Sequence, residues 1–205
     1  MAYGETLFET SCSALLLHET PADPADSSCS HVKHPTEGEA PDSFFLRRLR
    51  AERLTEAHLP VIRSMHRNER MMATLGGVRS DAESDAYLTR NLAHWTEHGF
   101  GIWILRDAAT GRVAGRAGLR RLEVEGQAEV ELACALFPEF WGRGLATDAA
   151  RACVTIARDW LGLSSLVALT LPSNVASQRV LRKAALVQER EVMHGGRKHL
   201  LFRTD

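Results

Sequence analysis

Hydrophobic and polar residues follow two different spacings along the chain, and these spacings predict its helices and strands. Apolar residues three to four positions apart are typical of helices, whereas strict alternation or a short apolar run is typical of strands. Helices are predicted at residues 55–67, 80–98, 145–161 and 174–184. Strands are predicted at residues 44–50, 100–106, 112–123, 128–136, 165–171, 186–192 and 198–203.

Capping residues mark several of these boundaries. Thr55 is a suitable N-cap for the first helix, Ser80 and Glu83 form a capping box for the second, and Gly99 ends it. The order is a strand, two helices, three strands, a helix, a strand, a helix and two strands. It predicts a mixed α/β fold in which residues 128–171 form a strand–helix–strand crossover with two parallel strands.

Residues 1–43 lack this periodicity. Four prolines interrupt a stretch rich in Ser, Asp, Glu and Ala, and eight acidic residues stand against one lysine. We expect an acidic, disordered tail at residues 1–43 and one folded domain at residues 44–205.

The charge and cysteine content narrow the class of protein. The last 162 residues hold 24 basic and 18 acidic side chains, an excess that suits an anionic cofactor but is too small to indicate nucleic acid. No CxxC pair and no membrane-length apolar run occur, which predicts a cytoplasmic protein with free thiols and no membrane contact. Cys29, His31 and His34 resemble part of a metal site that lacks a fourth ligand, so no metal is expected.

A glycine-rich loop between a predicted strand and a predicted helix is the most informative segment. Its sequence, Trp141-Gly142-Arg143-Gly144-Leu145-Ala146-Thr147, directs unpaired N–H groups and the positive end of the helix dipole toward one point. It is neither a Walker loop nor a dinucleotide fingerprint. It therefore predicts either a pyrophosphate site of another kind or an ordinary tight turn.

A second motif lies where the helix at residues 174–184 begins. Asn174 and Ser177 are three residues apart and share one face of that helix. Alone, they indicate no more than a helix cap.

Together these segments resemble the GNAT superfamily of acetyl-CoA-dependent N-acetyltransferases, in the branch similar to RimJ and RimL, the ribosomal-protein N-terminal acetyltransferases. The resemblance covers residues 44–202 and is carried by residues 55–59, 98–103, 114–119, 129–136, 141–147 and 174–183. It implies a GNAT-like mixed, mostly antiparallel twisted sheet with a central parallel pair and flanking helices.

The resemblance also implies where the cosubstrate acetyl-CoA binds. Main-chain amides of the loop would hold its pyrophosphate, although Trp141 stands where the family has Arg or Gln, and the pantetheine would lie in a gap beside the strand at residues 129–136. The predicted cofactor-binding residues are Leu136, Phe137, Trp141, Gly142, Arg143, Gly144, Leu145, Ala146, Thr147, Asn174 and Ser177.

For a direct transfer of acetyl from sulfur to a primary amine, the resemblance implies Glu131 as general base. Glu129 shares its face of the strand and is the alternative, and a surface ion pair is the other role open to both carboxylates. The tyrosine that many relatives place beside the sulfur is missing, so Ser177 is predicted to assist the leaving thiolate unless it only caps its helix. A main-chain N–H near residues 133–135 would bind the oxyanion.

Other chemically active residues are predicted to be structural. Cys134 has no paired base to make a thiolate nucleophile, and His94 and His98 are expected to be exposed polar groups on one helix. The tryptophans expected in the core or in cleft walls are Trp95, Trp103 and Trp160.

Two functions are open at this point. The first is an N-acetyltransferase whose acceptor is a protein N-terminus or a small amine, and the second is a non-catalytic acyl-CoA sensor or interaction module. The loops at residues 71–79 and 194–198 would decide the acceptor. Dimers are common among similar proteins, but one sequence does not determine the oligomeric state.

Overall fold

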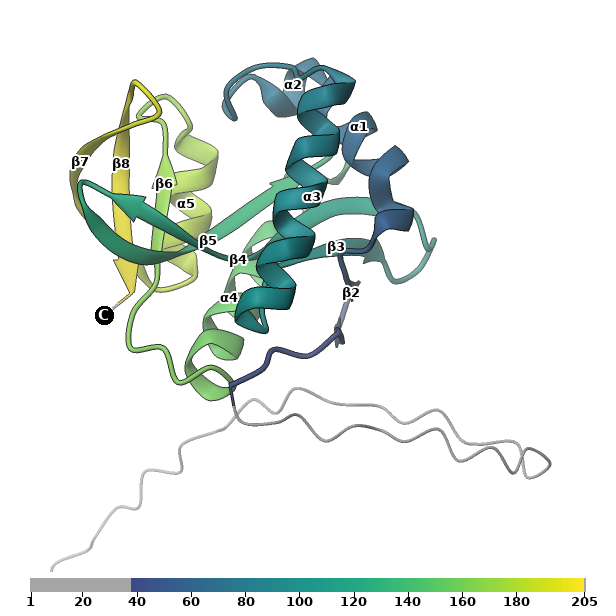
Figure 1. The fold of residues 1–205 in the computed structure, drawn as a ribbon, viewed down its shortest axis with the longest axis horizontal. Coiled ribbons are helices and arrows are strands. Elements are labelled where there is room, and N and C mark those ends of the chain that lie inside the picture. The colour runs from purple at the N-terminus through teal and green to yellow at the C-terminus, as the bar shows by residue number, and fades with distance from the viewer. Residues whose placement is uncertain (1–37, 205) are drawn as a thin grey trace, which may run out of the picture.

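A computed structural model describes residues 38–204 of the chain, and its strands form one sheet in the order β1-β2-β3-β4-β5-β6-β8-β7 (Figure 1). All neighbouring strands are antiparallel except β5 and β6, so the predicted sheet with a central parallel pair is confirmed. The strands are β1 (Ser43–Leu46), β2 (Leu49–Arg53), β3 (Ile102–Asp107), β4 (Val113–Val124), β5 (Gln127–Leu136), β6 (Val167–Thr170), β7 (Leu186–His194) and β8 (Arg197–Thr204).

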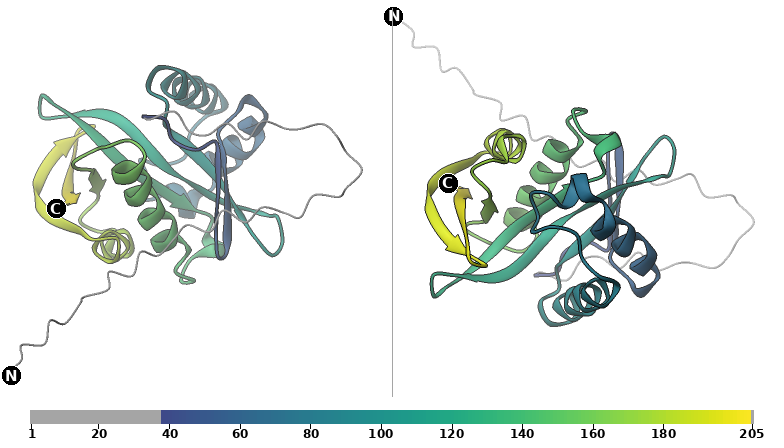
Figure 2. Two further views of the ribbon diagram at one scale, coloured as in Figure 1. Left: turned by 90° about the horizontal axis from the view of Figure 1, so that it is seen from below. Right: turned by 90° about the horizontal axis from the view of Figure 1, so that it is seen from above.

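Helices cover both faces of the sheet. Figure 2 shows α1 and α3 on one face and α4 and α5 on the other. No helix within residues 38–204 is both long and apolar enough to cross a membrane. The helices are α1 (Leu59–Arg67), α2 (Glu69–Met72), α3 (Asp81–His98), α4 (Leu145–Asp159) and α5 (Val175–Lys183), with short 3₁₀ turns η1 (Glu56–His58) and η2 (Pro138–Phe140).

Each face of the sheet buries its own hydrophobic cluster. Under α4, the small side chains of Ala149, Ala150 and Cys153 let the helix pack closely on β4 and β5. On the other face, Ile62 and Met65 of α1 pack with α3 against β3. Trp95 and Trp103 are buried in the core, and Trp160 packs against it, as predicted.

Two predicted elements differ from the observed ones. The single strand expected at residues 44–50 is a hairpin, because Leu46 pairs with Leu49 across a turn at Arg47 and Arg48. The first helix begins as η1, where Thr55 and His58 form a capping box, and α1 then starts at Leu59 with Pro60 in its first turn. The four-residue helix α2 was not predicted, because it is too short to show a helical period.

The segment just before β1 packs against the domain. The Ala40 amide donates to Gly99 O at 2.9 Å, and Trp103 Nε1 donates to Pro41 O at 2.9 Å. Residues 38–43, which were expected in the tail, therefore pack with the domain. The expected tail and the Cys29, His31 and His34 pattern fall on residues 1–37, outside the described residues.

The feature that positions the site is the separation of β5 from β6. β5 pairs along its length with β4, and β6 pairs along its length with β8. Between β5 and β6, only Glu131 and Val167 are paired. Beyond that point the two strands diverge (Figure 1). Ala133, Cys134 and Ala135 are therefore half-buried in the middle of the sheet, whereas Leu132 and Leu136 beside them are buried.

Candidate functional site

The glycine-rich loop leads directly from the end of β5 into α4. Gly142 and Gly144 have φ values of +72° and +77°, in the left-handed region that side chains disfavour. The amides of Thr147 and Asp148 make the first helical bonds, both to Gly144 O at 3.1 Å. Amides of residues 142–146 precede these bonds and find no backbone acceptor in the described part of the chain. The start of α4 thus presents a set of unpaired N–H groups suited to an anion.

Arg48, in the turn between β1 and β2, holds this loop in place through two hydrogen bonds. Its Nη1 donates to Arg143 O at 2.6 Å, and its Nη2 donates to Asp148 Oδ2 at 2.8 Å. A Cβ at Gly144 would lie 3.2 Å from that Nη2. Arg48 therefore fixes the loop and neutralises the one carboxylate in the first turn of α4. Sequence reasoning missed Arg48, because it lies 95 residues from Arg143.

Among the loop side chains predicted to contact the cosubstrate, Trp141 and Arg143 have other partners and Thr147 is buried. Trp141 Nε1 donates to Leu136 O at 2.7 Å. Arg143 Nη2 lies 3.3 Å from Asp107 Oδ2, and its guanidinium packs over the Phe140 ring. Thr147 is buried in the first turn of α4. What the loop offers a ligand is its backbone.

The Asn174 and Ser177 motif starts α5, just after the end of β6. Asn174 Oδ1 accepts from the Ser177 amide at 3.1 Å, and Asn174 Nδ2 donates to Thr74 Oγ1 at 3.1 Å. Thr74 lies in the loop that joins α2 to α3. This loop therefore contacts the start of α5, close to where β5 and β6 diverge. The Ser177 hydroxyl is half-buried and has no partner among the described residues.

Backbone groups of β5 also face the gap. The Phe137 amide donates to Ala114 O on β4, whereas Leu136 O faces the other way and accepts from Trp141. Because peptide groups alternate in direction along a strand, the Cys134 amide also points away from β4. It is directed to the side where β6 no longer pairs.

The two candidate bases differ in how their oxygens are used. Glu131 is 6% exposed, and its Oε2 lies 2.6 Å from Arg120 Nε, while Oε1 has no partner among the described residues. Both oxygens of Glu129 are held by Arg203, at 2.6 and 3.1 Å. These contacts also raise the pKa of the Arg203 guanidinium. Glu131 therefore keeps an oxygen available for a proton, and Glu129 does not.

Cys134, His94 and His98 are not arranged for catalysis. Burial raises the pKa of the Cys134 thiol to about 12, which keeps it protonated. His94 and His98 are half-buried, not exposed as predicted. His94 Nδ1 donates to Phe100 O at 2.8 Å and its Nε2 accepts from the Arg121 amide at 2.9 Å, while the His98 ring packs against those of His94 and Phe100. Within residues 38–204, no three His, Cys, Asp or Glu side chains gather as metal ligands.

A group of basic side chains beside β5 was not predicted as part of the site. Arg116 on β4 lies directly opposite Ala135, is 8% exposed, and stacks over the Tyr87 ring at 4.4 Å. His66 lies against Arg116, and Arg79 approaches the same ring nitrogen of His66. These residues come from four separate segments, and only the fold brings them together.

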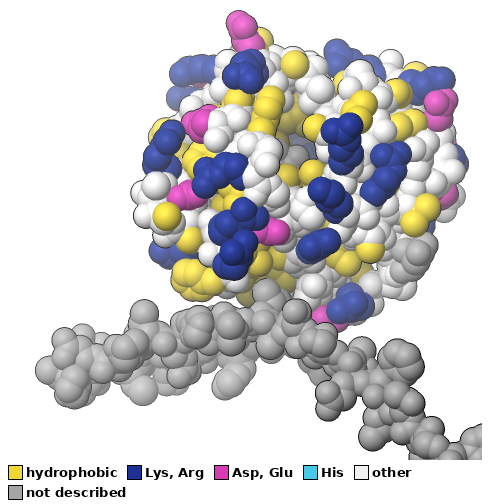
Figure 3. All heavy atoms as spheres, turned by 180° about the vertical axis from the view of Figure 1, so that it is seen from behind, with side chains coloured by type: hydrophobic (Ala, Val, Ile, Leu, Met, Phe, Trp, Pro, Cys, Tyr) yellow, Lys and Arg dark blue, Asp and Glu magenta, His cyan; other side chains and the backbone are white. Residues whose placement is uncertain are grey.

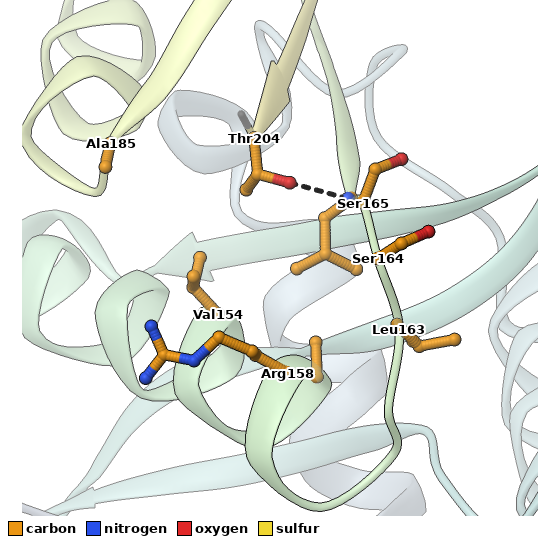
Figure 4. Close-up of a pocket in the computed structure, with 9 residues that line it drawn as sticks. Val154, Arg158, Leu163, Ser164, Ser165, Ala185 and Thr204 are labelled. Atoms are coloured by element: carbon orange, nitrogen blue, oxygen red, sulfur yellow. Dashed lines mark hydrogen bonds between the residues drawn. The ribbon is translucent and has the colours of Figure 1, made fainter.

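The surface away from this group has two other features. The side bearing α4 and α5 shows more Lys and Arg than Asp and Glu side chains around a hollow (Figure 3). A separate cavity of about 200 Å³ lies near the end of α4 (Figure 4). Two of its hydroxyls serve the fold, because Thr204 Oγ1 accepts from the Leu166 amide and Ser165 Oγ accepts from Arg203.

Several solved acetyltransferases share this fold. An acetyltransferase from Agrobacterium tumefaciens strain C58 is 24% identical, with a TM-score of 0.71 over 80% of this chain and 94% of that one. RimL, the ribosomal L7/L12 N-terminal acetyltransferase, solved with coenzyme A, is 16% identical, with a TM-score of 0.65 over 77% and 94% of the two chains. The ribosomal-protein S5 alanine acetyltransferase of Vibrio fischeri is 18% identical, with a TM-score of 0.65 over 79% and 95%. At these identities the likeness is one of fold.

Sequence comparisons extend the likeness to the family. YkkB of Bacillus subtilis strain 168, an uncharacterised protein, is 28% identical over 116 residues, which is 57% of this chain and 67% of YkkB. The model of the acetyltransferase (GNAT) domain matches residues 48–187, which include the loop, β5 and the start of α5. The chain therefore belongs to the GNAT family of acetyltransferases, as its sequence predicted.

Proposed function

We propose that this protein is an acetyl-CoA-dependent N-acetyltransferase of the RimJ/RimL-like branch, and that it transfers acetyl directly to a primary amine. The observation that carries the proposal is the divergence of β5 and β6, with the unpaired amides of α4 at one end and Ser177 across the gap. This arrangement suits a long thioester with a pyrophosphate at one end. The fold shared with the RimL–coenzyme A complex supports the same cosubstrate.

In this proposal three groups of the chain act on the reacting atoms. Glu131 Oε1 takes a proton from the acceptor ammonium, directly or through water, so that the amine can attack the thioester carbonyl. The Cys134 amide donates to the oxygen that becomes negative. The N–C bond forms, the nitrogen gives up its second proton, and the C–S bond breaks while the Ser177 hydroxyl donates a hydrogen bond to the sulfur. This second proton, passed on through water, protonates the sulfur, so that coenzyme A leaves as the thiol.

The competing proposal is a non-catalytic acyl-CoA sensor. The missing tyrosine favours the sensor. Among residues 38–204 the tyrosine is Tyr87, which lies on α3 and not after the glycine-rich loop. The open oxygen of Glu131 and the unpartnered Ser177 hydroxyl favour catalysis instead.

A free-thiol assay separates the two functions. The protein is incubated with acetyl-CoA and a panel of small primary amines and N-terminal peptides, with a tertiary amine as the control that cannot form an amide. We expect thiol release that requires a primary amine and yields the acetylated acceptor in equal amount. Binding of acetyl-CoA without amine-dependent release for any acceptor would contradict the enzyme and favour the sensor.

A further inference from the structure

Two guanidinium groups beside β5 lie partly or fully buried, and neither forms an ion pair among residues 38–204. Arg116 is 8% exposed, and its Nη1 lies 3.1 Å from His66 Nε2. Arg79 is half-buried, and its Nη1 lies 3.5 Å from the same nitrogen. Within residues 38–204, neither has a carboxylate within 4.0 Å. Buried charges in proteins are normally paired with an opposite charge, and the part of the chain that the structure describes supplies no such ion pair for these two.

His66 does not supply the missing charge. The Ser84 hydroxyl donates its one proton to Ser80 O at 2.9 Å, so it accepts from His66 Nδ1, 2.9 Å away. His66 Nε2 then carries no proton, and its lone pair faces both guanidiniums. Burial and the two arginines lower the pKa of His66 to about 3, so the ring is neutral at physiological pH.

Neighbouring carboxylates are bound elsewhere. Glu131 is paired with Arg120, and the exposed Glu83 receives the N–H and O–H of Ser80, each at 2.8 Å. Counting Arg79, Arg116 and Arg120 against Glu131 and the exposed Glu83, whose charge also acts on Arg79, this group of side chains carries an excess of one positive charge. The Tyr87 ring lies 4.4 Å from the Arg116 guanidinium and 5.8 Å from that of Arg79, and it keeps them in place.

The two guanidiniums adjoin the proposed transfer site. Arg116 is directly opposite Ala135, and side chains paired in this way share a face with Cβ atoms about 5 Å apart. Arg116 thus stands on the face of the sheet that carries Glu131. Arg79 lies in the same loop as Thr74, whose hydroxyl accepts from Asn174 at the start of α5.

We propose that the acceptor is a small amine that also carries a carboxylate, and that Arg116 and Arg79 bind this carboxylate while the amine faces Glu131. The proposal rests on the acetyltransferase function and names its substrate class. Arginine is well suited to the task, since its planar fork matches the two oxygens of a carboxylate. A small acceptor is favoured over a peptide, because Arg116, Tyr87 and His66 are enclosed by α1, α3 and the sheet.

The test compares matched acceptors in the thiol-release assay. Each ω-amino acid from glycine to 4-aminobutyrate is paired with the amino alcohol of the same chain length, and kcat/KM is measured at a pH where both amines are equally deprotonated. We expect at least one amino acid to exceed its alcohol by about tenfold or more, the usual scale for one charge-assisted contact. Equal values in every pair, or activity confined to peptides, would overturn the proposal.

Variants assign the effect to the arginines. Arg116→Gln and Arg79→Gln should each raise KM for the preferred amino acid about tenfold, with KM for acetyl-CoA and activity on the alcohol little changed. Arg90→Gln, on the exposed side of α3, is the matched control. Arg79 lies in a loop, so its variant keeps the test valid even if Arg116→Gln fails to fold. If both folded variants match the wild type, the arginines do not bind the acceptor.

A binding measurement keeps this proposal separate from the proposed function. Thermal unfolding is followed with each amino acid and alcohol at millimolar concentration, without acetyl-CoA. A rise in midpoint with an amino acid but not its alcohol, lost in Arg79→Gln, would support the anion site even if no amine were acetylated. If no amine is acetylated and no midpoint rises, the anion site is refuted as well.

Discussion

Replacing Glu131 with glutamine should lower kcat about 100-fold, the lower end of what a positioned general base contributes. The amide has nearly the shape of the carboxylate but cannot take a proton from the acceptor. Because the Glu131 side chain lies on the face of the sheet away from α4 and its loop, the Kd of acetyl-CoA should stay within about twofold of the wild-type value. Steady-state kinetics and calorimetric titration of acetyl-CoA measure the two quantities.

Glu129→Gln is the matched control. Glu129 shares the face of Glu131 and is paired with an arginine at the same 2.6 Å distance, so its variant also removes a carboxylate–arginine pair. It should leave kcat nearly unchanged. A larger loss in Glu129→Gln than in Glu131→Gln would assign the base to Glu129 instead.

Ser177→Ala should also lower kcat more than affinity, by about tenfold, if its hydroxyl assists the leaving sulfur. The helix cap at this position comes from Asn174 and the Ser177 amide, which the substitution keeps. If Ser177→Ala and Glu131→Gln both turned over at the wild-type rate, these roles would be wrong.

Replacing Gly144 with valine should weaken acetyl-CoA binding by about tenfold or more. A residue with a side chain at φ +77° costs about 1–2 kcal/mol, and each 1.4 kcal/mol corresponds to about tenfold in affinity. The new Cβ would also press on Arg48 Nη2 and disturb the brace that holds the loop. The amides at the start of α4 would then no longer converge on the pyrophosphate. Calorimetric titration with acetyl-CoA measures the loss.

Gly162→Val provides the comparison at the other end of α4. Gly162 also has a positive φ, of +62°, but a Cβ there meets nothing within 4 Å. This variant should lose stability from backbone strain and keep its affinity for acetyl-CoA. An equal loss of affinity in both variants would mean that the loop geometry at Gly144 has no special part in binding.

Local sequence signals predicted the elements that begin and end with clear chemistry. Ser80 with Glu83 forms the predicted capping box of α3, and Gly99 ends that helix in the left-handed conformation. The glycines before α4 predicted the loop, because few other residues adopt the backbone angles observed there. The turn at Arg47 and Arg48 carries no glycine or proline, so the β1–β2 hairpin looked like one strand.

The parts of the site that the sequence did not predict depend on long-range contacts. Arg48 and Asp148 are 100 residues apart, and Arg116 and His66 are 50 apart. Nothing around Arg116 distinguishes it from the many other arginines of this chain until β4 and α1 place it against a neutral histidine. In the same way, the resemblance favoured Glu131 over Glu129 as the base, and only the structure shows that Arg203 occupies both oxygens of Glu129.

Thermal unfolding of the wild-type protein with acetyl-CoA tests the central claim most directly. Dephospho-CoA, which keeps the pyrophosphate, and pantetheine, which lacks it, serve as comparisons. We expect acetyl-CoA and dephospho-CoA to raise the midpoint in proportion to the logarithm of their concentration, and pantetheine to have little effect. Unchanged midpoints with millimolar acetyl-CoA would contradict the pyrophosphate site at the start of α4 and, with it, the acetyl transfer built on that site.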